Sequence, residues 1–119
     1  MTTQITLPEL AAGEYNAGLI LKEDGTPDYW LIGLPGELEA ATWQQAMYWA
    51  KEQDGDLPNC RELNLLRANA RKEFKDYWYW SNEKNESSWA WFQYFGNGYQ
   101  DDHYRDDELR ARAVRRLPI

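Results

Sequence analysis

The sequence contains a single cysteine and a single histidine among 119 residues. Cys60 cannot form an intrachain disulfide, and zinc sites built from paired cysteines are excluded. His103 alone excludes a histidine-rich metal site and argues against a histidine-based catalytic triad. Ser87 and Ser88 have no histidine at a motif spacing, and no glycine-rich phosphate-binding loop is found. We therefore expect a protein that is not an enzyme and that needs no cofactor.

Long apolar segments are also missing. No apolar run approaches the roughly 20 residues that a membrane-spanning helix needs. Residues 1–5 show no basic stretch followed by an apolar one, so we expect no signal peptide. The length fits one domain over residues 1–119, which is large enough to bury a core without disulfides. These features predict a soluble cytoplasmic protein without a membrane partner.

Basic residues are scarce in the first half of the chain. The protein has 13 Lys and Arg against 20 Asp and Glu, which gives a net charge of −7. Residues 1–56 carry ten of the acids and only two lysines. An acidic half disfavours nucleic acid and suits basic protein surfaces. We expect the C-terminal arginines to pair with these acids rather than to contact phosphates: Arg110, Arg112, Arg115 and Arg116.

Residues that favour β-strands occur at both ends of the chain. Asp24-Gly25 separates two such runs and predicts a β-hairpin over residues 15–33. Residues 77–80 and 89–95 are aromatic runs that fit strands better than helices. Further along the same region we expect a polar loop at 81–88, a turn at 96–98, a polar acidic segment at 99–108 and a last strand at 109–117.

Two helices are expected in the middle of the chain. Thr42 followed by Gln45 is a capping-box pattern, and the helix that it opens should end at Gly55. Asn59 and Glu62 repeat the capping pattern and predict a second helix. The buried face of the second helix is expected to hold four residues: Leu63, Leu66, Ala70 and Phe74.

Strands and helices are segregated along the chain rather than alternating. This order predicts an α+β fold with two helices packed on a mainly antiparallel sheet. We expect the core to include Trp43, Leu63, Leu66, Phe74, Trp78 and Trp91. Seven Trp and eight Tyr exceed what so small a core needs, and such residues recur at binding hot spots. Some of the tyrosines should therefore be exposed, among Tyr77, Tyr79, Tyr94, Tyr99 and Tyr104.

Two further features were candidates for chemistry. The carboxylates of residues 101–108 surround His103 and could supply oxygen ligands for Ca²⁺. Their spacing differs from that of an EF-hand loop, which favours a solvated or partner-contacting loop instead. Cys60 lies at a predicted helix start, where the helix dipole lowers the pKa of a thiol. Since no catalytic partner for this thiol is identifiable, we predict neither a metal site nor catalysis.

Four short segments, in matching order and spacing over residues 42–117, resemble the Lcl C-terminal-like domain family. They are Leu57-Pro58-Asn59 with Glu62-Leu63, Tyr79-Trp80-Ser81, Ala90-Trp91 with Phe95 and Gly98, and Arg112-Ala113-Val114-Arg115. The resemblance implies a C-type-lectin-like fold, which that family shares with the formylglycine-generating enzyme and with the variable proteins of phage retroelements. The family occurs in bacteria and is common in phages and prophages, so a phage-encoded protein would act in the host cytoplasm.

The sequence departs from its relatives in ways that limit what the resemblance implies. Asn82 replaces the second serine of the family's YWSS motif, and residues 1–41 lie outside the similarity. The paired cysteines of formylglycine-generating enzymes and the calcium-binding motifs of C-type lectins are missing. The resemblance therefore implies a fold, with residues 111–119 inside the sheet, but no catalytic or calcium-dependent activity.

In retroelement variable proteins, the late strands and loops display the ligand-binding residues. By this resemblance we expect binding residues at Tyr94, Asn97, Tyr99, Asp101, Asp102, His103, Tyr104 and Arg105. The leading hypothesis is a non-enzymatic phage or prophage module that binds another protein. The alternatives are a small acidic inhibitor of a host defence or nucleic-acid-processing enzyme, similar to an anti-CRISPR protein, and a glycan-binding adhesion domain.

Overall fold

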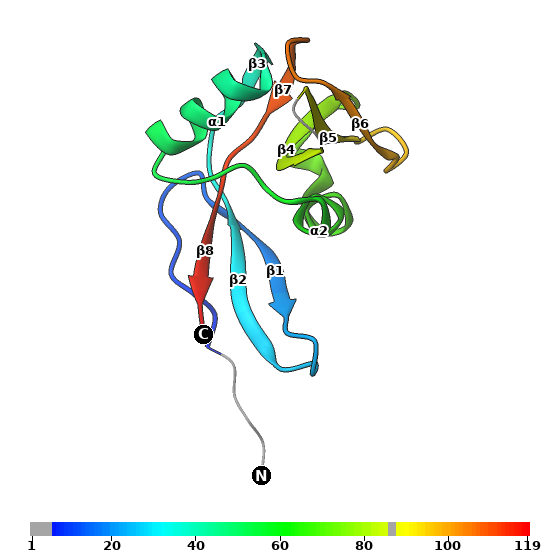
Figure 1. Ribbon diagram of the computed structural model, residues 1–119. Helices are drawn as coiled ribbons and strands as arrows, with labels where there is room; N and C mark the ends of the chain where they lie inside the picture. Colours follow the sequence, from blue (N-terminus) through cyan, green and yellow to red (C-terminus); the bar gives the residue numbers. More distant parts are fainter. Residues whose placement is uncertain (1–5, 86–87) are drawn as a thin grey trace.

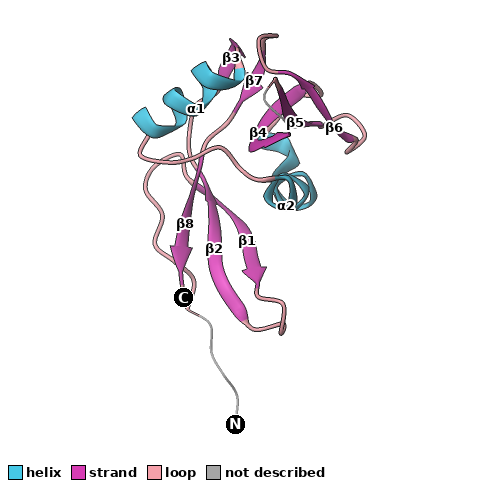
Figure 2. Ribbon diagram, in the orientation of Figure 1, coloured by secondary structure: helices cyan, strands magenta, loops and turns pink. Residues whose placement is uncertain are grey.

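The computed structural model describes residues 6–85 and 88–119, which form two α-helices and eight strands (Figures 1 and 2). In chain order they are β1 (Tyr15–Leu21), β2 (Pro27–Gly33), β3 (Leu38–Ala41), α1 (Trp43–Glu52), α2 (Cys60–Ala70), the short 3₁₀ helix η1 (Arg71–Glu73), β4 (Trp78–Asn85), β5 (Trp89–Tyr94), β6 (Gln100–Tyr104), β7 (Leu109–Ala111) and β8 (Val114–Pro118). The α+β class and the hairpin at 15–33 are confirmed.

The strands form two sheets rather than one. A three-stranded sheet has the order β1-β2-β8, and a five-stranded sheet has the order β3-β7-β4-β5-β6. All pairs are antiparallel except β4 with β7. In Figure 1 the smaller sheet extends downward as an arm, while the larger sheet lies above it beside both helices. Helix α1 packs on β3, β4 and β7, and α2 packs on β1, β4 and β5.

The single C-terminal strand that we expected is split between the two sheets. Strand β7 lies inside the larger sheet, but most of residues 111–119, which we expected inside a sheet, belong to β8, an edge strand of the smaller one. The chain leaves the larger sheet between β7 and β8, where the backbone of Ala113 and Val114 forms hydrogen bonds with residues outside that sheet. The Ala113 carbonyl accepts from the Leu34 amide at 3.0 Å, and Val114 exchanges two backbone hydrogen bonds with Asp56.

Both predicted capping boxes are present. The Thr42 and Asn59 side chains accept from the backbone amides of Gln45 and Glu62, whose side chains accept from the cap amides in return. The end of α1 differs from our expectation, because Asp54 adopts the left-handed conformation with φ of 59°. Gly55 serves another purpose: a Cβ at this position would lie 2.5 Å from the Val114 carbonyl oxygen. Its small size therefore permits the backbone contact that holds β8.

Three further assignments were wrong. Phe74 is buried but follows η1, because α2 ends at Ala70. The expected loop at 81–88 is largely strand, since β4 continues to Asn85; residues 86 and 87 lie outside the described part of the chain. The acidic segment forms β6, which pairs with β5. Polar residues suit this strand because β6 is the outermost strand of the sheet, so its side chains need not be buried.

Strand β4 separates two apolar cores. Trp80 lies in one core with Trp43 and other residues of α1, and Tyr79 lies in the second with residues of α2. Both aromatic side chains are almost fully buried, because successive side chains of a strand point to opposite faces. Trp78 was expected in the core, but it lies beyond the buried centre of β4 and is 42% exposed. Trp91 is only half-buried.

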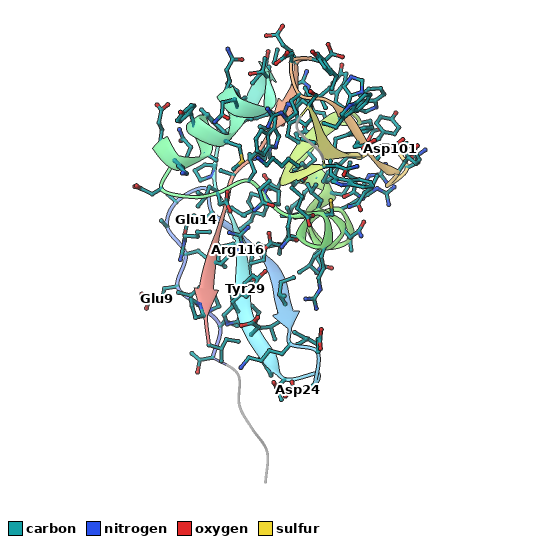
Figure 3. The ribbon with its side chains drawn as sticks, in the orientation of Figure 1. Glu9, Glu14, Asp24, Tyr29, Asp101 and Arg116 are labelled. Atoms are coloured by element: carbon teal, nitrogen blue, oxygen red, sulfur yellow. The ribbon has the colours of Figure 1, made fainter. Side chains whose placement is uncertain are left out.

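The C-terminal arginines pair with acids of the first half, as predicted. Arg110 and Arg112 contact Glu37 at 2.5 and 3.3 Å. Farther along the chain, Arg115 contacts Glu14 at 2.9 Å and Arg116 contacts Asp56 at 2.9 Å, and Figure 3 labels Glu14 and Arg116 where the arm meets the rest of the molecule. These pairs join segments that are more than 50 residues apart in sequence.

Glu62 is the fully buried partner of Arg116. Its carboxylate accepts from the Arg116 guanidinium at 2.7 and 2.8 Å, from the Asn59 amide and from the Tyr29 hydroxyl. Burial, together with the hydrogen bond to Glu62, raises the pKa of Tyr29 to about 12. The Tyr29 hydroxyl therefore remains a hydrogen-bond donor at neutral pH. The buried Glu62 carboxylate accepts hydrogen bonds from groups of β2 and β8 and from the residue that caps α2.

We expect Glu62→Gln to lower the free energy of unfolding by about 3 kcal/mol or more, because it leaves a half-buried guanidinium short of a partner. Urea denaturation followed by Trp fluorescence measures the change. Glu52→Gln, at the exposed end of α1, is the matched control and should change stability by less than about 0.5 kcal/mol. Equal midpoints for the two variants would contradict the assignment of Glu62.

Stability should also fall in acid through Glu14 and Glu37. The hydrogen bond from Arg115 lowers the pKa of Glu14. Burial alone would raise the pKa of Glu37, but the hydrogen bonds from Tyr79 and Arg110 and the charges of Arg110 and Arg112 outweigh burial, so the pKa of Glu37 is also lowered. A lowered folded-state pKa gives stability that is present above the unfolded value of 4.5 and is lost as pH falls through the folded value. Glu37→Gln should therefore reduce the loss of unfolding free energy between neutral pH and about pH 2.5. A variant with an undiminished acid-induced loss would contradict this account.

Candidate functional site

Strand β6 carries four of the eight predicted binding residues along the free edge of the larger sheet. It pairs with β5 on one side and, among the described residues, with no strand on the other. The Tyr99 carbonyl accepts from Tyr94, and the Arg105 amide donates to Ser88. Because backbone groups of an antiparallel strand alternate in direction, those of residues 100, 102 and 104 point toward the free edge.

The side chains of β6 divide between the two faces of the sheet. Asp101 and His103 lie opposite Phe92 and Ala90, on the face covered by α1. Asp102 and Tyr104 project from the other face, and Tyr104 meets Trp89 edge to face with ring centroids 6.2 Å apart. Tyr104 and Trp89 are 45% and 43% exposed, so the pair presents a large aromatic surface to solvent.

Local hydrogen bonds fix the polar groups of this edge. The Tyr99 hydroxyl donates to the Asp101 carboxylate at 2.6 Å, which lowers the pKa of Asp101 and raises that of Tyr99. The Asn85 amide donates to Asp102 at 2.7 Å, and His103 lies 2.7 Å from Asp107. The carboxylates of Asp101 and Asp102 are therefore held in place at the surface while keeping lone pairs for an external donor.

Three predicted site residues make structural contacts. Asn97 accepts from the Tyr99 amide at 2.9 Å and so forms the turn between β5 and β6. The Arg105 guanidinium lies over the Trp43 ring, 5.1 Å from its centroid, and the Arg105 carbonyl accepts from the Trp43 amide. Tyr94 is half-buried against the core beneath α1. The remaining five predicted residues flank the free edge of β6 on its two faces, and with Trp89 we call them the β6 surface: Trp89, Tyr99, Asp101, Asp102, His103 and Tyr104.

A hollow of about 340 Å³ opens beside this surface, and three of its seven lining residues are aromatic. It is lined by Glu39, Tyr77, Trp78, Tyr94, Glu108, Leu109 and Arg110. Trp78 stacks on Phe92 with centroids 4.9 Å apart and also meets the His103 ring at 5.6 Å, so the hollow and the β6 surface are continuous. We call this feature the aromatic hollow.

The sequence held only part of the information needed to find this hollow. Four aromatics in succession, residues 77–80, cannot all enter a core from one strand, and this excess was a usable signal for Trp78. Glu39 and Glu108 carried no such signal. They come together because β3 pairs with β7, which places Ala41 opposite Leu109.

The structure was also compared with the two kinds of chemistry considered above, metal binding by the acids of residues 101–108 and an activated thiol at Cys60. Within residues 6–85 and 88–119, no group of three His, Cys, Asp or Glu side chains is placed to hold a metal ion. Our expectation of a lowered thiol pKa at the start of α2 was wrong. Burial, reinforced by a hydrogen bond to Glu83, raises the pKa of Cys60 to about 12.

No helix in the described part of the chain is both long and apolar enough to cross a membrane. In comparisons with known proteins, no family model matches the sequence, and no curated protein matches it either.

Cys60 should therefore react slowly with alkylating reagents. At pH 8 we expect its reaction with iodoacetamide to be about 100-fold slower than in the urea-unfolded chain, where the thiol pKa returns to about 8.5. Glu83→Gln should speed the reaction only in part, because burial remains. Mass spectrometry of timed samples measures the rates. A folded-state rate equal to that of the unfolded chain would contradict the raised pKa.

Proposed function

We propose that this protein is a non-enzymatic interaction module that binds another protein through the β6 surface. The observation that carries the proposal is the free edge of β6, whose backbone groups lie between exposed aromatic rings and fixed carboxylates. A partner strand can add to such an edge through main-chain hydrogen bonds while side-chain contacts supply specificity. Tyrosine and tryptophan are the residue types that dominate binding energy at interfaces.

The charge of this region favours a basic partner. Residues 101–108 contain five carboxylates, and Arg105, the one cation among them, lies over the Trp43 ring. Figure 3 places Asp101 at the outer tip of the larger sheet, far from Asp24 on the arm. Complementary charge increases the rate of association and excludes partners of the same sign. We therefore infer a partner with a basic strand or loop.

We further propose that the scaffold is C-type-lectin-like and belongs with the Lcl C-terminal-like domains of phages and prophages. Two features support this proposal. The four sequence segments lie in family order, and the two helices pack beside a larger sheet whose late strands carry the exposed aromatics. On such a scaffold the late strands are where ligand-binding residues are displayed.

A second candidate function is inhibition of a host defence or nucleic-acid-processing enzyme. The five carboxylates of residues 101–108 favour it, because a row of fixed negative charges can occupy a groove that normally binds phosphates. The ten acids of residues 1–56 give the inhibitor function less support than their number suggests, because several of them are paired. Glu14, Glu37 and Asp56 are neutralised by the C-terminal arginines and do not form a free acidic face.

The proposal is tested by capture with the immobilised protein from a lysate of the bacterium that carries the gene. The captured protein is then purified and its affinity is measured by calorimetry. Tyr104→Ala should weaken binding about ten-fold or more, and Asp102→Lys should weaken it further by reversing a charge. Tyr48→Ala is the matched control, since Tyr48 is 63% exposed on α1.

The proposed function fails if both β6 variants bind the purified partner as tightly as the wild type does. The inhibitor alternative is favoured instead if the partner is a nucleic-acid-processing enzyme and if DNA competes with this protein for it. A partner that proves to be a glycan would exclude both proposals.

A further inference from the structure

We infer that the aromatic hollow is a binding site for an arginine side chain of the partner. The inference deepens the proposed function and rests on it, because it names the residue that the partner would insert beside the β6 surface. The hollow opens on strands β3, β4, β5 and β7 and touches the β6 surface through Trp78 and His103.

Three aromatic side chains line the hollow. Trp78 and Tyr77 are 42% and 52% exposed, and Tyr94 is half-buried beside them. One face of Trp78 is covered by Phe92, with the ring planes inclined by 23°. The exposed part of the Trp78 side chain faces a space in which a planar cation can stack.

The rim of the hollow is negative. Arg110, which also lines the hollow, contributes a positive charge, and its partner Glu37 is shared with Arg112, so Glu37 offsets only part of that charge. Glu39 and Glu108 are both exposed, and neither forms an ion pair within residues 6–85 and 88–119. Two carboxylates against one guanidinium leave the lining of the hollow with a net negative charge. Trp78 and Tyr94 remain for stacking, because Arg110 already covers one face of Tyr77, and together these features favour a cation over a neutral or anionic group.

The protein already uses the same contact in this hollow. The Arg110 guanidinium lies over the Tyr77 ring, 4.1 Å from its centroid. Arg112 over Phe74 and Arg105 over Trp43 repeat the arrangement elsewhere in the molecule. A guanidinium suits the site better than an ammonium, because its planar face stacks on a ring while its edge donates to two carboxylates.

The experiment uses N-acetyl-arginine amide as the probe and N-acetyl-citrulline amide as its neutral control of the same shape. Binding is followed by NMR through the indole N–H signals of the seven tryptophans, with the Trp78 signal assigned from a Trp78→Phe variant. The arginine probe should shift the Trp78 signal saturably with a millimolar Kd. The citrulline probe should leave it unchanged at concentrations up to about 50 mM.

The double variant Glu39→Gln and Glu108→Gln should bind the arginine probe at least ten-fold more weakly. Both positions are exposed, so the variant should fold, and Glu52→Gln is the control for a general loss of negative charge. The inference is overturned if arginine and citrulline shift Trp78 equally, if neither shifts it, or if the double variant binds as the wild type does. A shift caused only by neutral sugars would identify a glycan site instead and would also overturn it.

The two proposals can fail separately. If the arginine probe does not bind but Tyr104→Ala weakens binding to the purified partner, the proposed function stands and the arginine site does not. If the arginine probe binds at Trp78 but the β6 variants keep full affinity for the partner, the β6 surface is not the docking site. The proposed function then fails and the hollow remains a guanidinium site.

Discussion

The ion pair between Arg116 and Glu62 is the interaction on which the arrangement of the two sheets depends. It joins β8, at the edge of the arm, to the first turn of α2, and Tyr29 of β2 donates to the same carboxylate. A buried charge costs several kcal/mol unless it is paired and hydrogen-bonded, and the observed placement of β2 and β8 supplies Glu62 with the Tyr29 hydroxyl and the Arg116 guanidinium. Because α2 also packs on β4 and β5, this pair indirectly sets where the larger sheet lies relative to the arm.

Strand β4 then determines which aromatic residues are exposed. Its centre is occupied on both faces, by Trp80 toward α1 and by Tyr79 toward α2, so each core is closed by one ring. Trp78 lies one residue before this centre and faces the side of Phe92, where it has a stacking partner but no helix above it. The exposure of Trp78 is therefore a consequence of how two helices of limited length cover opposite faces of one strand.

The sequence was sufficient where local chemistry decides the structure. Hairpin and capping patterns predict the turn between β1 and β2 and the starts of α1 and α2, because turn residues and cap hydrogen bonds act within a few positions. It was insufficient for β6 and for the division of β7 from β8. Asp101 and Asp102 have low strand propensity, and β6 forms because β5 offers a free edge that no local pattern reveals. The hollow likewise depends on bringing Glu39 beside Glu108, a contact made only by sheet topology.

The internal use of the arginines determines the charge of the surface. Four C-terminal arginines lie against Glu14, Glu37, Asp56 and Glu62, so much of the positive charge of the chain is neutralised between its segments. The excess of negative charge behind the net charge of −7 therefore lies elsewhere, in the acids of the hairpin tip and of residues 101–108. Exposed rings on a free sheet edge would ordinarily promote pairing of identical chains, and carboxylates on that edge oppose it by repulsion. The same carboxylates attract a basic strand, so one arrangement of charge disfavours self-association and favours a partner of opposite charge.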